Sequence, residues 1–167
     1  VQAKKVLKFF EGTELMQKLA ASIRKGANAY LKRQYTTVAK IFIVVFVILL
    51  ILAWVGLLDN WFIPFAFVTG GIYSALAGFI GMKIATSANA AHESLNRGLN
   101  VAFSSGAVMG FTVVGLGLLD VSIWFHILKY IAGFPAEKIA QTMVMFGMGA
   151  SFMALFGRVG GGIFTKA

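Results

Sequence analysis

The feature that most constrains this chain is the uncharged run over residues 41–58, which reads IFIVVFVILLILAWVGLL. As a helix rising about 1.5 Å per residue, the run would cover about 27 Å, close to the thickness of the hydrocarbon core of a bilayer. In lipid, only helices and closed barrels satisfy all of their backbone hydrogen bonds. The run therefore predicts a transmembrane helix in an all-α integral membrane protein.

Three further apolar segments extend this prediction to a polytopic helix bundle with four full spans. The second span repeats Gly70, Ser74 and Gly78 at every fourth position, which lets helix backbones approach closely. The expected organisation is a basic lead-in over residues 1–40, spans at 41–58, 61–82 and 101–127, a cytoplasmic loop at 83–100, and a last span with a cytoplasmic extension at 139–167.

The composition agrees with a membrane protein. Hydrophobic residues make up 59% of the chain and charged residues 13%, against about a quarter charged in soluble domains. The chain has no cysteine, which excludes disulfides, thiolate metal sites and cysteine nucleophiles from it. It begins at Val1 without Met, and we expect it to be an incomplete part of a longer protein.

Basic residues are unevenly distributed along the chain. The net charge is +9, and nine of the fifteen Lys and Arg residues lie within residues 1–40. With four spans, thirteen basic residues fall on the side of residues 1–40, and only Lys129 and Lys138 fall on the other. The positive-inside rule therefore places the end that carries Arg158 and Lys166 in the cytoplasm. Without basic–aromatic interleaving or a reading motif, this charge favours the lipid bilayer over nucleic acid as a partner.

Residues 13–38 have the pattern of a basic amphipathic helix. We interpret it as a cytoplasmic lead-in helix near the lipid headgroups, with specific lipid binding as the alternative. Residues 1–10 could instead be the end of an earlier span.

Arg158 and Lys166 are the candidate site residues. They lie eight positions apart, so a continuous helix would place them on broadly the same side, about 12 Å apart. Two cations facing one cavity suit a multiply charged anion such as a phosphate. Between them lie glycines 160–162, weak helix formers that allow a backbone or ligand to come close. The alternative for Arg158 is a side chain that reaches out to the headgroups.

The other ionisable residues predict less. Asp120 is interpreted as a solvated aspartate near the outer end of its helix, with an ion pathway as the alternative. His92 and His126 lack a ligand-type partner three or four residues away, so we expect loop or interface histidines. No Asp or Glu follows Arg158, and phosphate chemistry uses several carboxylates to hold Mg²⁺. The chain by itself is therefore expected to be inactive, with no catalytic or metal-binding residue of its own.

The terminal sequence RVGGGIFTKA resembles the signature at the inner end of the fifth transmembrane helix of membrane-bound, ion-pumping pyrophosphatases. Supporting matches in the same order are GTELMQKLAASIRKGANAYLKRQY at 12–35, SALAGFIGMKIAT at 74–86 and GLNVAFSSGAVMGFTVVGLGLL at 98–119. The resemblance covers nearly the whole chain and implies an N-terminal portion of such a pump.

The resemblance implies a homodimer of subunits with about sixteen spans, in which pyrophosphate hydrolysis at a cytoplasmic Mg²⁺-loaded site would drive Na⁺ or H⁺ out of the cytoplasm. The resemblance implies that Lys166 contacts pyrophosphate and that Arg158 takes part in the ion gate and coupling. The aspartates that hold Mg²⁺ would follow Ala167. It further implies a bacterial inner membrane, with Mg²⁺ as cofactor and K⁺ and Na⁺ as additional candidates.

Two alternatives stay open on the residues alone. One is a segment of a secondary transporter or channel, in which Arg158 lines a passive pathway. The other is a structural membrane-assembly subunit, for which replacing Lys166 by Ala would change no activity. The choice between Na⁺ and H⁺, and any dependence on K⁺, depends on helices outside this chain; the sequence leans to Na⁺.

Overall fold

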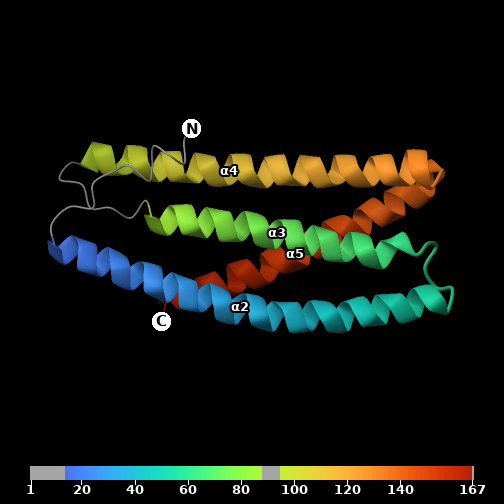
Figure 1. The fold of residues 1–167 in the computed structure, drawn as a ribbon, viewed down its shortest axis with the longest axis horizontal. Coiled ribbons are helices and arrows are strands. Elements are labelled where there is room, and N and C mark those ends of the chain that lie inside the picture. Colours follow the sequence, from blue (N-terminus) through green and yellow to red (C-terminus); the bar gives the residue numbers. More distant parts are fainter. Residues whose placement is uncertain (1–13, 88–94, 167) are drawn as a thin grey trace. The chain divides into compact units, whose positions relative to one another are not determined.

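The computed structural model describes residues 14–87 and 95–166, apart from the side chains of Met16, Ser87, Leu95, Arg97 and residues 158–166. Within these residues the chain is helical and contains no strand (Figure 1). The elements are α2 (Glu14–Trp54), α3 (Phe62–Ser87), α4 (Leu95–His126), the π-helical turn η1 (Ile127–Ile131) and α5 (Ala136–Lys166). The all-α prediction is confirmed.

Four of the described helical stretches are long and apolar enough to cross a bilayer. They cover Gln17–Trp54, Phe62–Thr86, Gly98–Ile131 and Ala136–Gly157. Each therefore corresponds to one of the four expected spans, which confirms a polytopic helical membrane protein.

α2 ends at Trp54, although the apolar run continues to Leu58. Gly56 adopts φ +81°, and the amide of Leu57 donates to the carbonyl of Leu52 at 3.0 Å. This is the glycine-terminated geometry that closes many helices. Hydropathy cannot detect it, because Val55 and Leu57 are as apolar as the helix before them. At its other end, α2 joins the expected lead-in and the first span in one continuous helix.

The remaining boundaries also extend beyond the apolar segments. α3 continues to Ser87 and α4 begins at Leu95, so helix occupies much of the expected 83–100 loop. The apolar segment reports only the part of a helix that matches the lipid core, and a helix can extend beyond it. Between η1 and α5 the chain reverses at Gly133, with φ +64°, and Pro135 immediately precedes α5.

The chain forms two compact units, each of which draws on several helices. The first comprises residues 1–33 and 77–114. Within it α3 meets α4 where a Cβ on Gly81 would lie 2.6 Å from the Met109 sulfur, so a larger residue at 81 would require the Met109 side chain to move.

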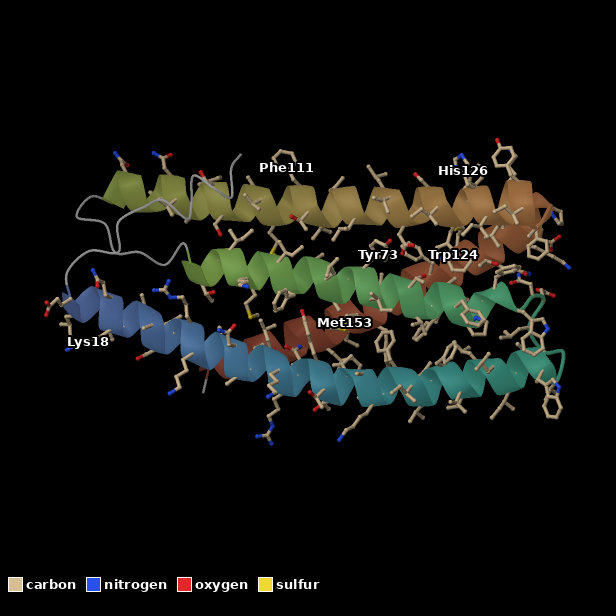
Figure 2. All side chains as sticks on the ribbon, in the orientation of Figure 1. Lys18, Tyr73, Phe111, Trp124, His126 and Met153 are labelled. Atoms are coloured by element: carbon tan, nitrogen blue, oxygen red, sulfur yellow. The ribbon has the colours of Figure 1, made fainter. Side chains whose placement is uncertain are left out.

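The second unit comprises residues 34–76 and 115–167 and contains all of α5. Its core is formed by Ala66, Trp124 and Leu128, and partly buried residues pack against this cluster: Phe62, Phe134, Ile139, Met143 and Phe146. Trp124 points from α4 toward α3 (Figure 2) and donates from Nε1 to the Thr69 hydroxyl at 2.8 Å. The core thus holds α3, α4 and α5 together.

Candidate functional site

α5 carries both candidate site residues. Its backbone is helical from Ala136 to Lys166, so Arg158 and Lys166 lie on one continuous helix despite the three glycines between them. The eight-residue separation then corresponds to about 12 Å along the axis. The side chains of both residues lie outside the described part of the structure. What the structure describes is the set of contacts that positions α5.

The closest of these contacts is the crossing of α5 with α3 (Figure 1). A Cβ on Gly70 would overlap the carbonyl oxygen of Phe146, and a Cβ on Gly149 would overlap that of Phe67. Each helix therefore contributes one glycine and faces one backbone carbonyl of the other. Such small residues let membrane helices pack at backbone-to-backbone distance.

An aromatic cluster joins α5 to α2 and α3. The Phe42 ring lies 5.2 Å from that of Phe67 and 5.7 Å from that of Phe152, while Phe152 meets Phe156 edge-on at 5.0 Å. Ring pairs at these separations add to the stabilisation from burial. The cluster extends along α5 to two residues before Arg158.

Asn60 ties the start of α3 to the start of α5. Its side-chain oxygen accepts from the backbone amide of Phe62 at 3.0 Å, which caps α3, and its Nδ2 donates to the Thr142 hydroxyl at 3.0 Å. Both Asn60 and Thr142 are buried, at 7% and 0% exposure. Because buried polar groups in an apolar environment need partners, this pair fixes the two helices relative to each other.

Two neighbouring side chains on α2 bind the backbones of α3 and α5. Gln34 donates from Nε2 to the carbonyl of Phe156 at 2.8 Å, and Tyr35 donates from its hydroxyl to the carbonyl of Ala75 at 2.7 Å. The first of these bonds reaches α5 at the position where the terminal motif begins.

Asp120 differs from the sequence-based expectation. We expected a solvated aspartate, but its side chain is only 2% exposed, so that expectation is wrong. Its Oδ2 has no hydrogen-bond partner among the described residues. Asp120 precedes Trp124 by one helical turn and therefore shares its inward-facing side of α4. Helical periodicity indicates this face, whereas reasoning from distance to the helix end misses it.

The histidines do not form a metal site in the described part of the chain. His126 contacts the carbonyl of Ser122 through Nδ1 at 2.9 Å, and its ring lies 5.4 Å from that of Tyr130. His92 lies outside the described residues. Residues 14–87 and 95–166 contain no group of three His, Cys, Asp or Glu side chains able to hold a metal ion.

The sequence alone did not identify Gln34, Asn60 or Gly149 as residues that position α5. Asn60 carries a usable signal, because an asparagine just before an apolar helix is a common N-cap. The sequence gives no such signal for Gln34, because a glutamine next to basic residues has the pattern of a solvent-exposed position.

Residues 1–167 match a protein family described as inorganic H⁺ pyrophosphatase. A putative K⁺-stimulated pyrophosphate-energized sodium pump of Bacteroides thetaiotaomicron is 51% identical over 98% of this chain and 24% of the relative. A K⁺-insensitive pyrophosphate-energized proton pump of Moorella thermoacetica is 42% identical over 97% of this chain and 24% of the relative. A K⁺-insensitive pyrophosphate-energized proton pump of Methanosarcina mazei is 40% identical over 99% of this chain and 23% of the relative.

These relatives are far longer than the chain. It spans about a quarter of the length of the curated relatives it matches.

Proposed function

Because the chain belongs to the inorganic H⁺ pyrophosphatase family, we propose that the full-length protein is a pyrophosphate-energised ion pump. Hydrolysis of pyrophosphate on the cytoplasmic side drives Na⁺ or H⁺ out across the membrane. The observation that carries this proposal is the family match over residues 1–167, which includes the terminal motif RVGGGIFTKA on α5.

In this proposal Lys166 binds a phosphate oxygen of the substrate. An ammonium group donates up to three hydrogen bonds to anionic oxygens, and bonds between charged groups are the stronger kind. Arg158, about 12 Å back along α5, belongs to the coupling path and ion gate rather than to the substrate pocket. Arg158 directly follows the stretch of α5 that could span the bilayer, Ala136–Gly157, and at that boundary its charge would pair with carboxylates from the rest of the protein.

The residues of this chain do not fit a Mg²⁺ site at that end. The six acidic residues all precede Arg158, at positions 11, 14, 59, 93, 120 and 137. Magnesium bound with phosphates uses carboxylates as protein ligands. The ligands would therefore come from later parts of the protein, and this chain contributes cations to the site.

The pumped ion is proposed to be Na⁺, with stimulation by K⁺. The support is similarity: relatives at 51% and 42% identity are described as putative K⁺-stimulated sodium pumps, although others at 42% and 40% are described as proton pumps. The orientation rests on the thirteen basic residues on the side of the Lys166 end. The subunit is further proposed to act as a homodimer in the inner membrane.

The deciding experiment measures pyrophosphate hydrolysis by membranes that contain the full-length protein, with Mg²⁺ and with or without Na⁺ and K⁺. The proposal expects Na⁺-stimulated hydrolysis together with Na⁺ uptake by inverted vesicles. If hydrolysis acidifies the vesicles and its rate does not change with added Na⁺, the protein is a proton pump. If no hydrolysis exceeds that of membranes lacking the protein, the pump proposal is wrong.

Replacing Lys166 tests its assigned role. We expect Lys166→Ala to lower kcat/KM for pyrophosphate about 10- to 100-fold, which is the size of one or two lost charge-assisted hydrogen bonds. The matched control is Lys129→Ala, which removes a lysine at η1 whose described contacts are the rings of Phe125 and Tyr130. The control should change kcat/KM by less than about twofold.

A further inference from the structure

The hydrogen bond from Gln34 to α5 has no role in the function proposed so far. We propose that Gln34 is a positioning residue, which fixes α5 where it enters the terminal motif and so sets the location of Arg158 and Lys166. This inference rests on the proposed function for its catalytic consequence, although the positioning itself can be measured without any activity.

The location of the bond is the first argument. The Gln34 amide donates to the carbonyl of Phe156 at 2.8 Å, two residues before Arg158. That carbonyl also faces the amide of Gly160 in the regular helical pattern, and its second lone pair accepts the bond from Gln34. Among the described residues, Gln34 thus bonds to the α5 backbone at the last residue of the aromatic cluster, four residues before the first of glycines 160–162.

The sequence that follows is the second argument. Glycines 160–162 lie just past the bond, and each glycine weakens a helix by about 1 kcal/mol relative to Ala. A helix that weakens at this point is sensitive to how the turn before it is held. The structure nevertheless keeps α5 helical through to Lys166, so the turn at Phe156 sets the direction of the motif.

A small tilt of α5 at Phe156 is enlarged at Lys166, because Lys166 lies far along the helix. Lys166 lies ten residues beyond Phe156, which is about 15 Å of helix. A tilt of about 5° at Phe156 therefore moves the Lys166 backbone by about 1.3 Å. A misplacement of about 1 Å can cost up to 100-fold in rate when a group must meet its substrate in a fixed geometry.

The chemistry of the amide is the third argument. A glutamine amide that is partly buried against a neighbouring helix is costly unless its hydrogen bonds are made. Gln34 is half-buried, and a Cβ on Gly157 would lie only 4.0 Å from its Nε2. A Cβ at position 157 would be at ordinary van der Waals distance, so the amide lies directly against α5 at this turn.

Tyr35 supplies a matched control on the same helix. Its hydroxyl donates to the carbonyl of Ala75 at 2.7 Å, a bond of similar length and type. That bond ends on α3, which carries neither Arg158 nor Lys166. Removing it changes the packing of α2 without releasing the α5 carbonyl.

The experiment compares Gln34→Leu, which keeps the approximate volume, with Tyr35→Phe in the full-length protein. We expect Gln34→Leu to lower kcat/KM for pyrophosphate at least about fivefold, equivalent to about 1 kcal/mol, and to lower the number of ions moved per pyrophosphate. Tyr35→Phe should change both by less than about twofold. Equal losses in the two variants would mean that Gln34 has only a structural role, and would overturn the proposal.

A distance measurement tests the positioning without activity. The chain has no cysteine, so cysteines introduced at Lys40 on α2 and Leu155 on α5, both exposed, accept spin labels selectively within it. Pulsed electron paramagnetic resonance should show a broader or shifted distance distribution in Gln34→Leu but not in Tyr35→Phe. An unchanged distribution would contradict the inference. If the unmodified protein hydrolyses no pyrophosphate, the function proposal fails, and this distance comparison still decides whether Gln34 positions α5.

Discussion

α5 is held differently on its two sides. Toward α3 it packs backbone against backbone through glycines 70 and 149, and the Asn60–Thr142 hydrogen bond joins the two helices nearer their starts. Toward α2 it is held by aromatic rings around Phe42 and by the Gln34 hydrogen bond to the Phe156 carbonyl. The glycine contact with α3 has no room to adjust, because backbone meets backbone. The contact with α2 is formed by long side chains, which can change their conformation.

The difference indicates a division of roles. Close packing at the glycines fixes how near α5 lies to α3, and an added methyl group there must displace a backbone. Side-chain contacts act at particular points along α5, at the Phe152 ring and at the Phe156 carbonyl, and so bear on how α5 is rotated and tilted. In the proposed function, the candidate site residues at the end of α5 depend on both. The following substitutions separate the two contributions, beginning with the largest expected effect.

Gly149→Ala should destabilise the full-length protein by about 3 kcal/mol, because the new Cβ would overlap the carbonyl oxygen of Phe67 and neither backbone can yield easily. The free energy of unfolding is measured by SDS titration in mixed micelles. Gly147→Ala is the matched control on the same helix, since a Cβ there meets nothing within 4 Å. A similar loss in both variants would show that the crossing is not the tight contact.

Asn60→Ala should lower the free energy of unfolding by about 2 kcal/mol, since it removes the cap of α3 and the bond to Thr142 together. The same titration measures it. Thr142→Val keeps the cap of α3 but removes the bond between helices and the hydroxyl's bond to the Lys138 carbonyl within α5, and should cost about 1 kcal/mol. In the double variant the effects should be less than additive; full additivity would mean that the two side chains do not act together.

Phe42→Leu should cost about 1 kcal/mol, because a smaller side chain loses the ring contacts to Phe67 and Phe152 while keeping the site apolar. Unfolding is followed by SDS titration, as before. A loss as large as that of Gly149→Ala would contradict the idea that the α2 side adjusts more easily than the α3 side.

Tyr35→Phe should have the smallest effect, about 0.6 kcal/mol, the average found for hydrogen bonds between membrane helices. Thermal unfolding of the purified protein in detergent is sufficient to detect it. A cost above about 2 kcal/mol would mean that the hydroxyl anchors α2 as firmly as the glycine crossing anchors α5.

The spans could be predicted from the sequence because a bilayer imposes one dominant rule, a long uncharged helix. The ends of the helices could not be predicted, because they depend on single residues. Gly56, with its positive φ, ends α2 inside an apolar run. Gly70 was expected to allow close helix packing, and the structure adds that its neighbour is α5. The family resemblance is confirmed by the match over residues 1–167.

The contacts that position the site were hidden from the sequence for a physical reason. Gln34 and Phe156 are 122 residues apart, and nothing in either segment indicates that an amide will meet a backbone carbonyl. Asp120 was misjudged because a charged residue near a helix end is usually solvated, whereas here it lies on the same face as Trp124. Lys166→Ala tests the proposed assignment of Lys166 directly.

The glycine crossing also has a consequence for biogenesis. Gly149 is synthesised about 80 residues after Gly70, which takes roughly 4 to 16 s at about 5 to 20 residues per second. During that interval the Gly70 face of α3 has no α5 to pack against, since α5 has not been made. The nascent protein must therefore keep this face accessible until α5 emerges, so the order of translation determines when the crossing can form.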